Sequence, residues 1–272
     1  MTTRLLTGTY VSGYHITPPV TIVSIATTGY VEGTGVTTPT AATGAYTVVN
    51  EGKVASSGAG IYLYTGGSIT NGASTDTTAS ISGTVGVVVG ADAGTVVNFA
   101  TISASRAASQ GVILAHGGSV TNGSASDTQA LVQGAEAVGV YLTAGTVRNF
   151  GTLQGGAMAP EGGAVYLGGG GSVINGSASD TTALIGGSLT LGSVDGVVTK
   201  NVAATVINYG DIVGASAGTV NYVYYTSTAI LLKAGGTVTN GASGASSAYI
   251  VITHVPVGAW IRAGWEWAFR RV

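Results

Sequence analysis

Hydrophobic and polar residues alternate with a period of two in many short segments of this chain. Segments such as "GIYLY" at 60–64, "GVILA" at 111–115 and "GVYLT" at 139–143 are rich in β-branched and aromatic residues. This alternation, bounded by glycine and serine, is typical of short β-strands. No long segment outside the C-terminal tail has the spacing of an amphipathic helix. The pattern therefore predicts an all-β protein.

A four-residue motif recurs among these segments: Ser or Thr, then Val or Ile, then any residue, then Asn. The asparagines recur about every 27 residues. Because side chains alternate along a strand, the Val or Ile and the Asn of each motif point to the same side. We expect that side to be the interior, and we expect the amides to hydrogen-bond one another in a structural ladder. The ladder residues are Asn50, Asn71, Asn98, Asn122, Asn149, Asn175, Asn208 and Asn240.

Three short strands in each unit of about 25 residues predict a single-stranded parallel β-helix, or β-solenoid. One coil cannot bury its apolar face alone, whereas stacked coils bury a continuous core. The motifs suggest about eight coils, and the preference of parallel crossovers favours a right-handed helix. We divide the chain into an N-terminal cap or degenerate first coils (1–45), β-helix repeats (46–252) and a Trp-rich C-terminal cap or tail (253–272).

The units alternate between two kinds. One kind follows the motif with "NG", a polar turn and "DT", and the other follows it with an aromatic residue and a new strand, as in "NFGTL". The first kind places Asp76, Asp127 and Asp180 at equivalent positions two coils apart, which is roughly 10 Å. That separation is too long for a shared calcium ion, so we expect each Asp to cap its own turn.

The composition excludes several functions. Only 7% of the residues are charged and the net charge is −2, with no basic block that could follow a phosphate backbone. We therefore expect no nucleic-acid partner. The absence of Cys excludes disulfides and thiolate metal sites. No apolar run approaches the length of a transmembrane segment, and nothing in the sequence suggests a metal or a cofactor.

Residues that could carry catalysis are few and scattered. The three histidines lie in unrelated parts of the chain, and the 11 acidic residues form no close pair. We therefore expect no catalytic residues and no enzymatic activity. A carbohydrate-active β-helix enzyme stays open as an alternative, with a cleft formed by the inserts at 187–204 or 214–228. That alternative requires acids such as Glu161, Asp180, Asp195 and Asp211 to cluster beside a groove.

One outward feature predicts a binding surface. In the third strand of each unit, inward apolar residues flank one outward residue, and stacking aligns these as an apolar stripe: Tyr62, Val88, Ile113, Tyr141, Tyr166 and Val198. Large exposed apolar patches mark interaction sites. Tyr62, Tyr141 and Tyr166 are thus candidate ligand-binding residues. A second outward column, of Ser and Thr, has an irregular neighbouring column that includes Arg148, which argues against ice binding.

The repeats "GGSVTNGSASDT", "GVYL" and "GTVRNFGTL" resemble the passenger repeats of bacterial adhesin-like and autotransporter-like surface proteins, over about residues 45–250. The resemblance implies a right-handed parallel β-helix, export by a Gram-negative bacterium, and a role in surface display or adhesion. It implies no catalytic residues. We expect a non-enzymatic extracellular element that binds a glycan, a surface or its own copies end to end, with an inert spacer of a larger exported protein as a further alternative.

Overall fold

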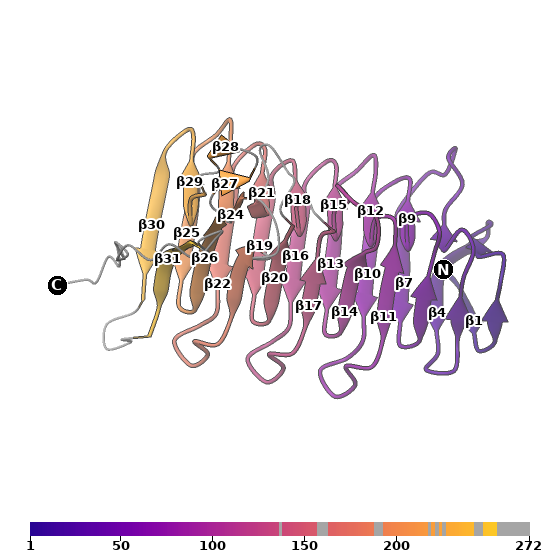
Figure 1. Ribbon diagram of the computed structural model, residues 1–272. Coiled ribbons are helices and arrows are strands. Elements are labelled where there is room, and N and C mark those ends of the chain that lie inside the picture. Colours follow the sequence, from indigo (N-terminus) through magenta and orange to yellow (C-terminus); the bar gives the residue numbers. More distant parts are fainter. Residues whose placement is uncertain are drawn as a thin grey trace.

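The computed structural model describes residues 1–135, 138–156, 163–187, 193–216, 219–220, 223–224, 227–241 and 247–254. Every regular element within these residues is a β-strand, and the coils follow one another along a single axis (Figure 1). The chain is thus a parallel β-helix, as its pattern predicts. Within the same residues, no helix is long and apolar enough to cross a membrane.

The coils build three parallel sheets, which we name A, B and C. Sheet A contains β1 (Thr2–Leu6), β4 (Val20–Ile25), β7 (Tyr46–Asn50), β10 (Gly67–Asn71), β13 (Gly94–Asn98), β16 (Gly118–Asn122), β19 (Gly145–Asn149), β22 (Gly171–Asn175), β25 (Ala204–Asn208) and β30 (Gly236–Asn240). Sheet B contains β2 (Thr9–Tyr10), β5 (Tyr30–Val31), β8 (Lys53–Ala55), β11 (Ser80–Gly83), β14 (Thr101–Ala104), β17 (Leu131–Gln133), β20 (Thr152–Gly155), β23 (Leu184–Gly187), β26 (Asp211–Ser216) and β31 (Tyr249–His254). Sheet C contains β3 (Tyr14–His15), β6 (Val36–Thr37), β9 (Ile61–Leu63), β12 (Val87–Val89), β15 (Val112–Leu114), β18 (Val140–Leu142), β21 (Gly163–Leu167), β24 (Ser193–Thr199) and β29 (Ile230–Leu232).

Equivalent motif positions pair in register between neighbouring coils. In sheet A, for example, Val120 pairs with Val147 and Asn122 pairs with Asn149. Sheets B and C join through a short antiparallel pairing of β24 with β26. A separate antiparallel pair consists of β27 (Thr219–Val220) and β28 (Val223–Tyr224). The register places every repeat directly over the one before it, so that equivalent side chains form columns along the rod.

Sheet A has ten strands, two more than the sequence motif indicates. The additional strands, β1 and β4, lie within residues 1–45 and continue the same sheet. Ile25 is in register with Asn50, and Leu6 is in register with Ile25. Both apolar residues are fully buried. A search for the Asn motif misses these two coils because an apolar side chain fills the same inward position.

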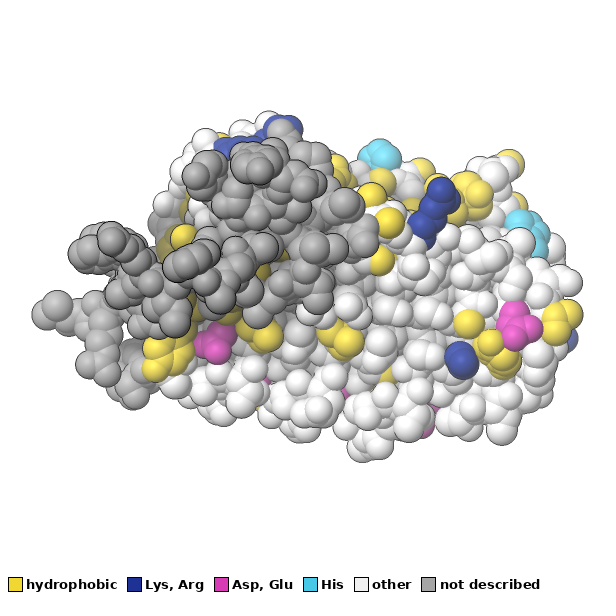
Figure 2. Space-filling model, in the orientation of Figure 1, with side chains coloured by type: hydrophobic (Ala, Val, Ile, Leu, Met, Phe, Trp, Pro, Cys, Tyr) yellow, Lys and Arg dark blue, Asp and Glu magenta, His cyan; other side chains and the backbone are white. Residues whose placement is uncertain are grey.

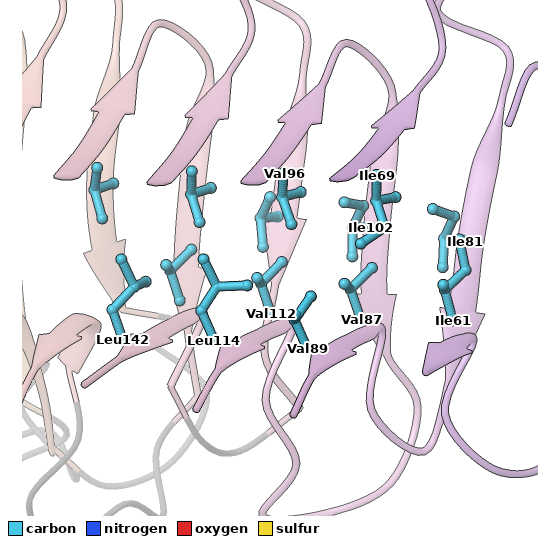
Figure 3. Close-up of a cluster of buried hydrophobic side chains, with 14 of the residues drawn as sticks. Ile61, Ile69, Ile81, Val87, Val89, Val96, Ile102, Val112, Leu114 and Leu142 are labelled. Atoms are coloured by element: carbon cyan, nitrogen blue, oxygen red, sulfur yellow. The ribbon is translucent and has the colours of Figure 1, made fainter. Parts of the chain in front are cut away.

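The inward residues of all three sheets form one continuous core. Val87 and Val89 of β12, Val96 of β13 and Ile102 of β14 are fully buried, and equivalent residues recur along the rod (Figure 3). In "SVTN" the Val and the Asn point inward, as predicted from the alternation. The core therefore runs along the rod through stacked Val, Ile and Leu side chains.

Two kinds of corner lead from sheet A to sheet B. Gly123 follows Asn122 with a φ of +75°, a left-handed conformation that glycine adopts readily, and a long turn then leads to β17. After Asn149 the chain instead passes through Phe150 almost directly into β20. The alternation of two repeat kinds in the sequence is thus an alternation of long and short corners.

A column of glycines forms the corner between sheets C and A. A Cβ on Gly145 would lie 1.9 Å from the carbonyl oxygen of Gly118, and a Cβ on Gly118 would lie 1.9 Å from that of Gly94. Such distances are far below van der Waals contact. Glycine is therefore required here for neighbouring coils to approach at the spacing of paired strands.

Candidate binding surface

The predicted asparagine ladder is confirmed. Between consecutive coils, the Nδ2 of one Asn donates to the Oδ1 of the next at 2.7 to 2.9 Å. From Asn50 to Asn208 these side chains are fully buried, and Asn240 at the end of the column is partly exposed. Buried amides with these partners stabilise the rod and are not available to a ligand.

The ladder also fixes the corners. The Nδ2 of Asn98 lies 2.9 Å from the carbonyl oxygen of Ala100 in its own short corner and 3.1 Å from that of Leu131 in the next coil. In the long corner, Asn122 reaches the carbonyl of Ala130 at 3.1 Å. In both kinds of corner, the Asn side-chain amide thus donates a hydrogen bond to a backbone carbonyl just before sheet B. These buried carbonyls would otherwise lack a hydrogen-bond donor.

The aspartates of the long corners cap their own turns, as predicted. The Oδ1 of Asp76 accepts from the amide of Thr78 at 3.0 Å and from its hydroxyl at 2.6 Å. Asp180 accepts from Thr182 in the same way, at 3.0 and 2.7 Å. Hydrogen bonds to the charged form, from the Thr78 hydroxyl and then its amide, lower the pKa of Asp76.

The acids that a glycosidase would need lie in separate elements. Asp180 is in a long corner, Asp195 of β24 accepts from the Thr228 hydroxyl at 2.8 Å, and Asp211 is on the outer face of β26. Partial burial raises the pKa of Asp211. Glu161 lies outside the described residues. Where the structure describes the chain, no group of three or more His, Cys, Asp or Glu side chains could hold a metal ion.

The outer stripe of sheet C forms one column in register. Val88 pairs with Tyr62 on one side and with Ile113 on the other, and the column continues through Tyr141 and Tyr166 to Val198. It is longer than the sequence indicated, because Thr37 precedes Tyr62 and Leu231 follows Val198. The predicted alignment of these residues in one column of sheet C is therefore confirmed.

The N-terminal half of the stripe is accessible. Tyr62, Val88 and Ile113 are all partly exposed. The ring of Tyr62 stacks on that of Tyr64, with centroids 4.0 Å apart and planes inclined by 16°. Sequence analysis did not select Tyr64, although the alternation in "GIYLY" gives it the same facing as Tyr62. The two tyrosines form a paired aromatic platform on the outer surface.

The C-terminal half of the stripe differs from the exposed surface that we expected. The ring of Tyr141 stacks on that of Tyr166 with centroids 5.1 Å apart. Tyr166 is 8% exposed and Val198 is 1% exposed, and together with Val138 they form a second hydrophobic cluster. Tyr166 therefore contributes packing in this structure and is not an exposed ligand-binding residue. Tyr141 packs against the same cluster but stays partly exposed.

The Ser and Thr column of sheet A forms hydroxyl pairs, each between two neighbouring coils. Thr47 lies 3.1 Å from Ser68, and Ser172 donates to Thr146 at 3.2 Å. Arg148 is exposed, as predicted, and its guanidinium lies 5.0 Å from the centroid of the Phe150 ring, in a cation–π contact. The hydroxyls satisfy one another, so this column has a structural role that needs no ligand.

Comparisons with family models, with curated proteins and with solved structures find no match for this chain. The fold is therefore established by strand topology and register, and the candidate surface by its own chemistry.

Proposed function

We propose that this protein is a non-enzymatic structural and adhesive element of a bacterial extracellular surface or matrix. We further propose that it binds a neutral glycan through the N-terminal half of the stripe. The paired platform of Tyr62 and Tyr64 carries the proposal. The likeness of the repeats to the passengers of exported surface proteins supports the extracellular setting.

A rigid rod suits this role. Each inner strand pairs with a strand on either side, and the ladder adds a buried side-chain hydrogen bond at almost every coil. Such a solenoid presents equivalent outer positions at a constant spacing of about 4.8 Å. An extended polymer that runs along the axis would therefore meet the same kind of position at each coil.

The chemistry of the accessible half fits a neutral sugar. Tyrosine presents an apolar ring and a polar hydroxyl, a combination suited to surfaces that are partly apolar and partly wet. The outward residues of β9, β12 and β15, namely Tyr62, Val88 and Ile113, have no charge. On the part of the surface that is not grey in Figure 2, charged side chains are also sparse. An anionic polymer would need clustered cations.

The test is binding of the purified chain to an array of neutral and anionic glycans, followed by titration of any glycan that binds. Tyr62→Ser combined with Tyr64→Ser should weaken binding about ten-fold or more, because both aromatic rings of the pair are lost. Tyr249→Ser is the matched control, since Tyr249 is 56% exposed and lies on sheet B.

Three other outcomes would contradict the proposal in different ways. No glycan binding at any concentration would favour the inert spacer. Binding that the double variant leaves unchanged would place the site elsewhere on the rod. Release of sugar fragments from a bound glycan would favour the carbohydrate-active enzyme.

A further inference from the structure

The C-terminal end of the rod exposes inward positions that are buried everywhere inside it. Val238 of β30 is 46% exposed, whereas Val206, its partner in the preceding coil, is fully buried. The last strands of the other two sheets show the same change: Ile230, Leu232 and Ile250 are partly exposed, and their preceding partners Val197, Thr199 and Ile212 are fully buried.

Such an end combines two features that favour association. The inward side chains of β29, β30 and β31 present apolar surface, and the outer edges of terminal strands present unpaired backbone groups. Solenoid proteins need polar or capped terminal repeats to stay soluble.

The N-terminal end of a second copy is a poor occupant. Arg4 of β1 is in register with Val23 and so stands at the inward position that Val238 occupies in β30. Stacking the two ends would bring a guanidinium against apolar core without a carboxylate partner, which carries a large desolvation cost. Head-to-tail joining of rods is therefore disfavoured by the residues at this column.

The chain itself supplies a better occupant. Residues 255–272, "VPVGAWIRAGWEWAFRRV", follow directly after β31 and lie outside the described residues. They include all three Trp of the chain, Trp260, Trp265 and Trp267, together with Ile261 and Phe269. A segment attached at the edge of an apolar surface has a high effective concentration there, and 18 residues can span far more than the width of one coil.

We propose that residues 255–272 cover the C-terminal end of the rod by packing their aromatic side chains on Val238, Leu232 and Ile250. The segment would then act as an intramolecular cap that keeps this end from pairing with another molecule. This inference concerns the end of the rod and stands independently of glycan binding.

Tryptophan fluorescence tests the proposal directly, because every Trp lies in the segment. In the full chain we expect blue-shifted emission and protection from acrylamide quenching. Val238→Arg places at this end the residue that β1 has at the same position, and should shift the emission to the red and remove the protection. Val202→Arg is the control, since Val202 is 53% exposed but lies in a turn outside the inward column. Far-UV circular dichroism checks that both variants keep the sheet.

Light scattering across a dilution series measures the oligomeric state. It therefore distinguishes a cap formed by the same chain from a contact with a second copy. We expect a monomer whose Trp protection is independent of concentration, and a chain ending at His254 that self-associates unless it also has Val238→Arg. Protection that disappears on dilution of a dimer would overturn the intramolecular cap and assign the end to a second copy. Solvent-exposed Trp emission in a monomeric full chain, unchanged by Val238→Arg, would overturn the proposal altogether.

Discussion

The two ends of the rod close their cores in different ways. At the N-terminal end, Leu6 and Ile16 are fully buried, and Tyr10 and Tyr14 stand at inward positions of β2 and β3. Their rings meet edge to face with centroids 5.8 Å apart. At the C-terminal end, Val238 remains 46% exposed. A bulky aromatic pair closes the first end, whereas the described residues of the last coil have no equivalent.

A single column shows the contrast most clearly. The inward position that holds Val or Ile through the middle of sheet A is Arg4 in β1 and Val238 in β30. An inward charge on an edge strand is a known device against edge-to-edge pairing. The comparison teaches that the repeated motif is enough to determine the packing inside a solenoid. Each end needs residues outside the repeat pattern to cover or protect its core.

The largest expected effect on stability comes from the asparagine ladder, where a substitution in the interior of the rod should cost more than one at its end. Asn122→Leu removes hydrogen bonds to Asn98, Asn149 and two backbone carbonyls in a fully buried site. We expect the free energy of unfolding to fall by about 3 kcal/mol or more, because several buried groups lose partners. Asn240→Leu, at the partly exposed end of the ladder, should lower it by about 1 kcal/mol. Urea unfolding measures both, and equal losses would mean that the ladder does not act as a column.

Removing an aromatic ring from the N-terminal end should have the next largest effect on the free energy of unfolding. Tyr10→Ala removes half of the aromatic pair above the core, and we expect a loss of about 1 to 2 kcal/mol. Hydrogen exchange should accelerate in β1 and β4 and stay unchanged in β16. Tyr249→Ala provides the control on an exposed outer position, with an expected change of about 0.5 kcal/mol or less. Uniform acceleration along the whole rod would contradict a local closure of this end.

Replacing the inward charge should change association more than stability. Arg4→Val gives the N-terminal end the apolar character of the C-terminal end, so we expect concentration-dependent oligomers by light scattering. The unfolding midpoint at low concentration should stay nearly constant, because Arg4 is exposed. Arg4→Lys keeps the charge and should remain as monodisperse as the parent chain. Association of the Lys variant would show that the charge is not the protective feature.

The smallest effects should come from two aspartates whose pKa values shift in opposite directions. The pKa of Asp76 is lowered from 3.8 by the hydrogen bonds from Thr78, so its contribution to stability is present above about 3.8 and is lost as pH falls through the folded value. The pKa of Asp211 is raised from 3.8 by partial burial. The stability linked to Asp211 is therefore greatest below about 3.8 and is lost as pH rises through its folded pKa.

Urea midpoints measured from about pH 2 to pH 7 check these signs. Asp76→Asn should reduce the loss of stability on acidification, and Asp211→Asn should reduce the loss on raising the pH. The two substitutions should therefore change the pH dependence of the midpoint in opposite directions. A shift of the same sign in both variants would contradict the assigned causes.

Much of the fold follows from short-range pattern. The alternation in "SVTN" sets the facing of Val and Asn, and the repetition sets their stacking, so the ladder follows from the sequence alone. The first two coils could not, because Leu6 and Ile25 replace the Asn that marks the others. Their inward positions are defined by register with later strands, which only the folded chain displays.

For the candidate binding surface, the sequence predicts the position of the stripe but not its accessibility. The stripe order from Tyr62 to Val198 follows from one outward residue per coil. Whether a position on it is covered depends on groups far away in sequence: Tyr62 stays partly exposed, whereas Tyr166 is buried in the cluster with Val138 and Val198. The stacking of Tyr64 on Tyr62 likewise depends on side-chain rotamers, which the alternation leaves undetermined.

The ladder also gives the rod a dipole along its axis. Each side-chain amide donates toward the C-terminus and accepts from the N-terminal side, so all the amide dipoles of the column point the same way and polarise one another. The column starts at a buried oxygen, the Oδ1 of Asn50, which has no hydrogen-bond donor because Ile25 stands where the preceding amide would be. The partial negative charge of the column therefore gathers at its N-terminal start and the partial positive charge at the opposite end. Two such rods lying side by side would attract each other when they run in opposite directions and repel when they run in the same one.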